Sequence, residues 1–129
     1  MSKRPVARSR PPLLWLLLSF SGRISRRIFW PALLATYCLN FALYFQLLGM
    51  TREELEGIGS FLLFLGAVVT LYVNLAISVK RLHDIGYTGF LAIAVAIPFL
   101  KLAFAVWAGI VPGTDGANRY GALPDRQPS

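Results

Sequence analysis

Three long stretches of the chain carry almost no charge, and short polar clusters separate them. The first stretch covers residues 28–50 and the second covers residues 58–79. Each is longer than the ~20 apolar residues that a helix needs to cross a hydrocarbon core of ~30 Å. Because backbone amides find no water in that core, both stretches are predicted to be transmembrane helices.

The third stretch, residues 85–111, is interrupted by Pro98 and Lys101. One interpretation is a single long span that kinks at Pro98, where the backbone lacks an amide hydrogen. Lys101 then lies deep in the membrane or reaches toward an interface. The other interpretation is a re-entrant pair of short helices that turns at residues 98–101. We favour the single span and keep the re-entrant pair as the alternative.

A shorter apolar run, Leu13–Leu18, follows a basic start and contains Trp15. It predicts a short interfacial helix with the indole at the depth of the lipid headgroups. The predicted fold class is therefore all-α, a small multi-pass transmembrane helix bundle with three main hydrophobic segments and an N-terminal interfacial helix. We divide the chain into a basic N-terminal segment (residues 1–19), a membrane domain (residues 20–123) and a flexible tail (residues 124–129).

The composition excludes most other classes of protein. Hydrophobic residues make up 56% of the chain and charged residues 15%, against about 45–50% and about 25% in soluble domains. A chain of 129 residues is too small to bury that much apolar surface. Cys38 is the single cysteine, which excludes a disulfide scaffold. The net charge of +7 arises from basic residues beside the spans, so anionic lipid explains it better than nucleic acid.

The distribution of basic residues predicts an orientation. Lysine and arginine occupy positions 3, 4, 8, 10, 23, 26 and 27 before the first span, whereas the loop of residues 51–57 contains Arg52 alone. By the positive-inside rule, the N-terminus is predicted to be cytoplasmic and this loop external. The connection of residues 80–84 is then cytoplasmic again.

The first polar cluster, residues 22–27, contains Arg23, Arg26 and Arg27 directly before the first span. Arginines at this place anchor and orient a span, or they bind lipid phosphates as an anion site, and the two roles are compatible. Ser25 is the predicted N-cap of the helix, with its hydroxyl accepting an amide of the first turn.

The second polar cluster, residues 80–90, contains the only histidine, His83. If the helix continues through it, Arg81 and Asp84 are predicted to pair on one face, while His83 points elsewhere. Gly86 and Gly89 are predicted to end that helix and to allow a tight link to the next. One histidine and one aspartate are too few for a zinc site. The sequence thus indicates no metal, no other cofactor and no catalytic residue, and we expect no enzyme.

The third polar cluster, residues 112–121, is rich in turn formers and contains Asn118 and Arg119. It is predicted to be an ordered turn that caps the end of the last helix. Inside the first two spans, Asn40 and Asn74 would be costly facing lipid. Each is therefore predicted to face another helix and to hydrogen-bond there.

Three motifs together resemble one known family. They are Gly22-Arg23-x-Ser25-Arg26-x-x-Phe29-Trp30, then Arg81-Leu82-His83-Asp84 with Thr88-Gly89-Phe90, then Asn118-Arg119-Tyr120-Gly121. In this order they resemble the bacterial inner-membrane family known as domain of unknown function 805, which includes YhaH-type proteins, over roughly residues 20–123. Ile28 and Phe90 depart from the family, which often has an acidic residue and a tryptophan there. The resemblance implies a multi-pass protein of the bacterial inner (plasma) membrane without an established activity. It draws attention to Arg23, Arg26, Arg81, His83, Asp84, Asn118 and Gly121.

Every polar cluster lies at a membrane boundary, which favours a non-enzymatic module that binds anionic lipid headgroups or a membrane partner. The candidate binding residues are Arg23, Arg26, Arg27, Arg81, His83, Asp84, Asn118 and Arg119. The alternative is a subunit of a small transporter or channel, suggested by Lys101, Asn40 and Asn74 inside the spans. Three helices cannot enclose a pathway, so this alternative requires a homo-oligomer. An enzyme that acts on lipid through His83 and Asp84 ranks last.

Overall fold

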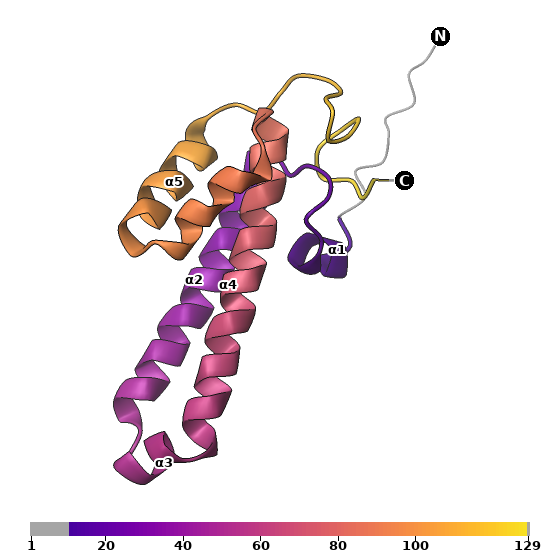
Figure 1. The fold of residues 1–129 in the computed structure, drawn as a ribbon. Helices are drawn as coiled ribbons and strands as arrows, with labels where there is room; N and C mark the ends of the chain where they lie inside the picture. Colours follow the sequence, from indigo (N-terminus) through magenta and orange to yellow (C-terminus); the bar gives the residue numbers. More distant parts are fainter. Residues whose placement is uncertain (1–10, 129) are drawn as a thin grey trace.

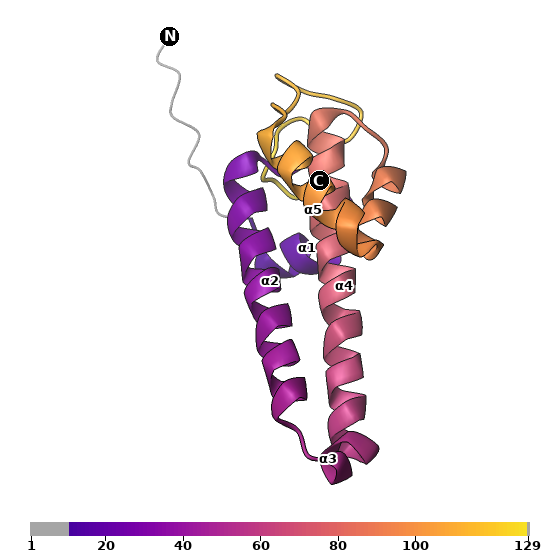
Figure 2. The same cartoon turned by 90° about the vertical axis from the view of Figure 1, so that its left-hand side faces the viewer.

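The computed structural model describes residues 11–128, and these residues are mainly helical (Figures 1 and 2). The elements follow in the order α1 (Leu13–Leu18), α2 (Arg26–Gly49), α3 (Arg52–Glu56), α4 (Ile58–Ile85), the 3-10 helix η1 (Gly89–Ala96) and α5 (Pro98–Ile110). The described part contains no β-strand, although an isolated antiparallel bridge joins Arg23 to Arg126. The all-helical class is thus confirmed.

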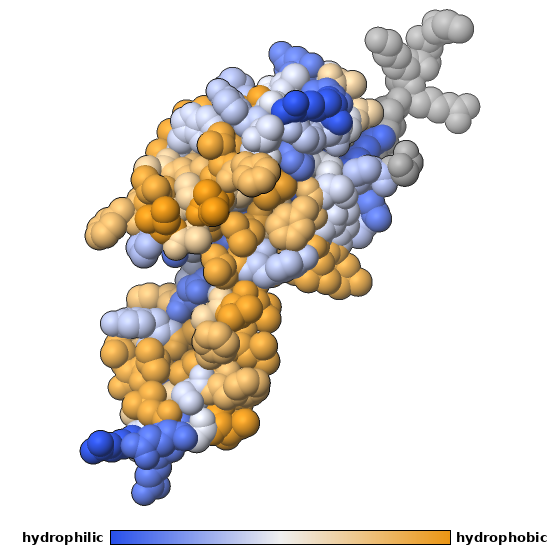
Figure 3. All heavy atoms as spheres, viewed as in Figure 1, coloured by the Kyte–Doolittle hydropathy of each residue, from blue (hydrophilic) through white to orange (hydrophobic). Residues whose placement is uncertain are grey.

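Helices α2 and α4 form a long antiparallel pair connected by α3 (Figure 1). With 24 and 28 residues, they extend about 36 Å and about 42 Å at 1.5 Å per residue. Both are long and apolar enough to cross a membrane, which agrees with the first two predicted spans. Hydrophobic side chains cover the visible face of this pair, and hydrophilic residues gather at its two ends (Figure 3).

The third apolar segment doubles back on itself, so the favoured single span is wrong and the alternative pair of short helices is what forms. The 3-10 helix η1 runs away from the end of α4, and α5 returns toward it (Figures 1 and 2). The two meet at Ile97, which is extended with φ −101° and ψ 118°. Proline disfavours helical geometry at the preceding residue and suits the first position of a helix. Pro98 therefore starts a new helix where a kink was expected.

The other helix ends follow local chemistry. Gly86, with φ 97°, ends α4 as predicted, because its amide bonds to the carbonyl of His83 and the Tyr87 amide bonds to that of Leu82. At the opposite end of the pair, Thr51 and Glu54 form a capping box at the start of α3. The backbone amide of Thr51, assisted by its hydroxyl, lowers the pKa of the Glu54 carboxyl.

The N-cap of α2 forms differently from the prediction. Ser25 stands at the N-cap position, but its side chain makes no capping hydrogen bond. Its backbone amide instead donates to Asp125 Oδ1 at 2.7 Å, and the Asp125 amide donates to the carbonyl of Arg23. These bonds attach Asp125 to the start of α2, although residues 124–129 were expected to form a flexible tail.

The hydrophobic core lies at the end of the α2–α4 pair where α1, η1 and α5 pack. Its buried side chains are Trp15, Leu16, Ile24, Phe29, Leu33, Ile77, Leu82, Ala92, Val95, Phe104, Ala105 and Ala108. Trp15, expected at headgroup depth, is only 5% exposed and packs into this core. The short helix that carries it does form, and its interfacial position stays a prediction.

Two polar pairs connect α2 to α4 within the apolar part of the pair. Thr36 Oγ1 donates to Asn74 Oδ1 at 2.7 Å, and Thr70 Oγ1 donates to Asn40 Oδ1 at 3.0 Å. Each asparagine also donates to a backbone carbonyl of its own helix, four residues earlier. The prediction that Asn40 and Asn74 hydrogen-bond to another helix is confirmed.

Candidate functional site

Asp84 lies between two arginines at the end of α4. Arg81 Nη1 donates to Asp84 Oδ2 at 2.5 Å, and Arg23 Nε donates to Asp84 Oδ1 at 3.0 Å. Both arginines are 0% exposed and Asp84 is 3% exposed. The pairing of Arg81 with Asp84 was predicted from their spacing, whereas nothing in the sequence indicated Arg23 as the second partner.

The remaining donors of Arg23 bind carbonyls of the third polar cluster. Nη2 donates to the carbonyl of Thr114 at 2.7 Å, and Nη1 donates to those of Gly116 and Gly121 at 2.6 and 3.1 Å. Glycine suits two of these places because Gly116 and Gly121 adopt φ values of 75° and 155°. With its donors used inside the protein, Arg23 has none left for a ligand.

Arg81 binds the end of α5 in a similar way. Its Nε donates to the carbonyl of Ala108 at 2.8 Å, and Nη2 donates to that of Val111 at 2.5 Å. A third bond joins Nη1 to the carbonyl of Ile24 at 3.2 Å. The last carbonyls of a helix lack partners within that helix, so Arg81 satisfies groups that would otherwise be left unpaired.

Two further side chains cap the same helix end. Trp30 Nε1 donates to the carbonyl of Gly109 at 3.2 Å, and Arg26 Nη1 donates to that of Ile110 at 3.0 Å. All four carbonyls from residue 108 to residue 111 thus accept from side chains of α2 or α4. This capping fixes the end of α5 beside the start of α2.

The third polar cluster caps a different helix from the one predicted. Asn118 Nδ2 donates to the carbonyl of His83 at 2.8 Å, and the Thr114 amide donates to that of Asp84 at 2.7 Å. The turn is ordered as predicted, but it covers the end of α4 rather than the end of α5. The turn can reach α4 because α5 returns to this end of the molecule.

Lys80 is a buried charge that the sequence analysis did not single out. It is 0% exposed, and its ammonium donates to the carbonyls of Trp15, Leu16 and Ser19. These are the C-terminal carbonyls of α1, where a cation is favourable. Lys80 therefore connects α4 to the end of α1. The only sequence feature that pointed to a buried role for Lys80 was its position next to Arg81.

His83 faces away from Asp84, as its position on the helix predicted. Its Nδ1 lies 3.2 Å from the carbonyl oxygen of Gly22, and its ring stacks on Tyr120 with 3.8 Å between centroids. The Arg119 guanidinium lies over the Tyr120 ring, 4.7 Å from its centroid. Asp84 and His83 therefore do not form an acid–base pair, and the part of the chain described here holds no group of three His, Cys, Asp or Glu residues that could bind a metal.

The predicted site residues thus divide into two sets. Arg23, Arg81 and Asp84 form the buried cluster, with Asn118 and His83 packed around it. Arg26, Arg27 and Arg119 are exposed at the same end of the molecule, as is Arg126. The first set joins α4 to the segment before α2, to the end of α5 and to the third polar cluster. The second set is exposed, and within it Arg26 also caps the end of α5.

Comparison with known proteins finds relatives over most of the chain. The family described as "Protein of unknown function (DUF805)" matches residues 17–122. Inner membrane protein YhaH of Escherichia coli is 28% identical over 113 residues, which cover 86% of this chain and 91% of that protein. Inner membrane protein YhaI is 28% identical over 107 residues, covering 83% and 86%. The uncharacterised Escherichia coli protein YiiR is 35% identical over 97 residues, covering 75% of this chain and 61% of YiiR. No solved structure matches.

Proposed function

The chain belongs to the DUF805 family of proteins of unknown function, and we propose that it is a non-enzymatic module of the bacterial inner membrane that binds anionic lipid headgroups. The buried arginines Arg23 and Arg81 assemble the fold in this proposal. The exposed arginines Arg26, Arg27 and Arg119 contact the headgroups. The two sets lie at one end of the α2–α4 pair, which we assign to the cytoplasmic leaflet.

The observation that carries this proposal is the position of exposed arginines beside a wide apolar surface. Arg26 and Arg27 are exposed in the first turn of α2, and large exposed apolar side chains such as Trp30 and Leu34 follow directly. A guanidinium binds phosphate through two parallel hydrogen bonds. At the far end of the pair, α3 carries three glutamates and one arginine. Basic residues outnumber acidic ones at the end with Arg26 and Arg27, so the charge is asymmetric along the molecule.

The arrangement of His83 and Asp84 supports a non-enzymatic role. Both oxygens of the Asp84 carboxylate bind arginines, and the His83 ring is held between Gly22 and Tyr120. A general acid–base pair needs groups within reach of each other and of a substrate. Asp84 is 3% exposed and its carboxylate is bound to two arginines, so it does not reach a substrate and does not pair with His83.

The experiment compares lipid retention in nanodiscs that contain equal amounts of phosphatidylglycerol and phosphatidylcholine. We expect the protein to retain phosphatidylglycerol preferentially, and the double variant R26Q/R27Q to lose most of that preference. A basic residue near an anionic surface contributes ~1 kcal/mol, so each substitution lowers the preference roughly fivefold. Arg52→Gln, an exposed arginine at the far end, is the matched control. Equal retention of the two lipids by the wild-type protein would contradict the proposal.

A second candidate, a subunit of a small oligomeric transporter or channel, rests on Lys101. Its Nζ lies 5.0 Å from the ring centroid of Tyr37, in the middle of α2, near the turn between η1 and α5. A charged residue at such depth is costly and is commonly functional. Because the chain is too small to enclose a pathway, this candidate predicts an oligomer in mild detergent. A strictly monomeric protein in sedimentation analysis would exclude it.

A further inference from the structure

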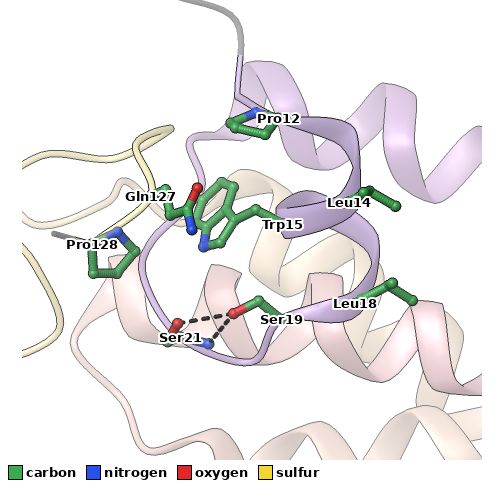
Figure 4. Close-up of a pocket in the computed structure, with 8 residues that line it drawn as sticks. All are labelled: Pro12, Leu14, Trp15, Leu18, Ser19, Ser21, Gln127 and Pro128. Atoms are coloured by element: carbon green, nitrogen blue, oxygen red, sulfur yellow. Dashed lines mark hydrogen bonds between the residues drawn. The ribbon is translucent and has the colours of Figure 1, made fainter.

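A groove runs between α1 and the last described residues of the chain. Three adjoining hollows of about 540, 550 and 470 Å³ compose it, and Pro128 lines all three. Figure 4 shows the part of the groove next to α1. We call the whole hollow the tail groove, because residues 119–128 form one of its walls.

One end of the tail groove is basic. Arg119 and Arg126 are exposed and line the same hollow. No acidic side chain lines any of the three hollows within residues 11–128. The positive charge is therefore not cancelled locally, as in a site that attracts an anion. Two guanidinium groups at one place suit a phosphate group.

The hollow next to α1 holds a donor without an acceptor. Trp15 is 5% exposed, and its Nε1 has no hydrogen-bond partner among the described residues. Its indole points toward the C-terminal segment, near Gln127 and Pro128 (Figure 4). A buried donor left unpaired costs free energy, so an oxygen-bearing ligand would gain by accepting from it. The hydroxyls of Ser19 and Ser21, 2.9 Å apart, lie beside it.

The hollow next to α1 also has apolar lining residues. Leu14 and Leu18 are 74% and 52% exposed, line the hollow next to α1, and point away from Gln127 and Pro128 (Figure 4). Four residues apart, they form a short apolar strip on the helix. The tail groove thus combines two arginines, an unpaired buried donor and exposed leucines, which match the phosphate, the ester oxygens and the acyl chains of a phospholipid.

We infer that the tail groove binds one phospholipid through an anionic phosphate headgroup. The phosphate lies at Arg119 and Arg126, a glycerol or ester oxygen accepts from Trp15 Nε1, and the acyl chains follow Leu14 and Leu18. This inference rests on the proposed function, which is binding of anionic headgroups at the end of the α2–α4 pair that carries the arginines. It adds a defined site and a single ligand to that function.

The test is a calorimetric titration of the full chain in a maltoside detergent. The probes are dihexanoyl-phosphatidylglycerol, dihexanoyl-phosphatidylcholine and inorganic phosphate. We expect saturable binding of one phosphatidylglycerol, at least tenfold tighter than that of either other probe. The variant R119Q/R126Q should bind phosphatidylglycerol at least tenfold more weakly, and Trp15→Phe, which keeps an aromatic ring but removes Nε1, about threefold more weakly. Arg52→Gln should leave the affinity unchanged.

The outcomes separate this inference from the proposed function. Absence of saturable phosphatidylglycerol binding, or equal binding by wild type and R119Q/R126Q, overturns the groove as a site. Inorganic phosphate that binds as tightly as phosphatidylglycerol overturns the assignment to lipid. If R26Q/R27Q alone removes the nanodisc preference and R119Q/R126Q does not affect the titration, the proposed function stands without the groove. Equal melting temperatures of the variants and wild type exclude unfolding as the cause.

Discussion

Asp84 shows how a single residue can have opposite effects through two kinds of electrostatic interaction. A negative charge in the last turn of a helix opposes the helix dipole, so this effect alone predicts that Asp84→Asn stabilises α4. The carboxylate, however, neutralises the buried Arg23 and Arg81. Removing one partner of a buried ion pair costs ~3–5 kcal/mol. We expect the loss to dominate, so that Asp84→Asn lowers the apparent melting temperature and the yield of folded protein in fluorescence-detected gel filtration.

Asp115→Asn provides the matched control for this prediction. Asp115 is exposed in the same loop that wraps Arg23, and its substitution should change the melting temperature by no more than a degree or two. A variant Asp84→Asn that is as stable as Asp115→Asn would show that the buried cluster does not depend on this charge.

Gly113 gives a second prediction for a single residue. A Cβ atom added there would overlap Asp84 Oδ2. Because Asp84 is fixed by two arginines, it cannot move aside without loss of those bonds. We expect Gly113→Ala to lower the apparent melting temperature measurably. Gly49→Ala, where no atom lies within 4 Å of the added Cβ, should leave it unchanged or raise it.

The sequence reveals the buried cluster only where its members are close in sequence. Arg81 and Asp84 are three residues apart on one helix, so their pairing follows from helical geometry. Arg23 lies 61 residues before Asp84, and its other acceptors are backbone carbonyls, which carry no sequence signal. The same holds for the three carbonyls around Lys80. These partners become apparent only when the path of the chain is known.

At the scale of elements, the polar pairs between α2 and α4 should contribute to stability. Asn74 is buried and accepts from Thr36 across the helix pair. Such bonds contribute about 0.6 kcal/mol on average and up to about 1.7 kcal/mol in membrane proteins. We expect Asn74→Leu to lower the free energy of unfolding by ~1 kcal/mol, measured by titration with a denaturing detergent. Gln46→Leu, an exposed position on α2, should have no such effect, and equal effects of the two would contradict the role of this pair.

The path of the third apolar segment depends on contacts that the segment itself does not encode. Its length suited one span, and Pro98 suited both a kink and a helix start. The pair of short helices differs from a single kinked span in that Arg26, Trp30 and Arg81 cap the end of α5. These donors come from other elements, so periodicity and hydropathy could not separate the alternatives. The two long helices, which need no such partners, were predictable from length and apolarity alone.

At the scale of the whole molecule, the return of α5 places all three polar clusters at one end. Thr114, Gly116 and Gly121 follow α5 and bind Arg23 from before α2. This arrangement predicts that a cysteine at Ala122 reacts with a membrane-impermeant maleimide from the same side of the membrane as a cysteine at Ser21. A cysteine at Glu53, beyond the far end of α2, must react from the opposite side. All three positions are exposed, and Cys38→Ser removes the single native thiol.

Labelling of intact and permeabilised cells separates the two topologies cleanly. Reaction of Ala122→Cys together with Ser21→Cys is expected, because a segment that crossed the membrane would move residues 112–121 away from Arg23 and leave its buried guanidinium without its carbonyl acceptors. That loss would be large, since each unpaired charged donor in an apolar environment costs more than a neutral one. Reaction of Ala122→Cys together with Glu53→Cys would mean that the segment spans the bilayer. Arg23 would then keep its bond to Asp84 but lose the carbonyls of Thr114, Gly116 and Gly121. Asp84→Asn would be destabilising in either topology, so the labelling pattern is what distinguishes the two.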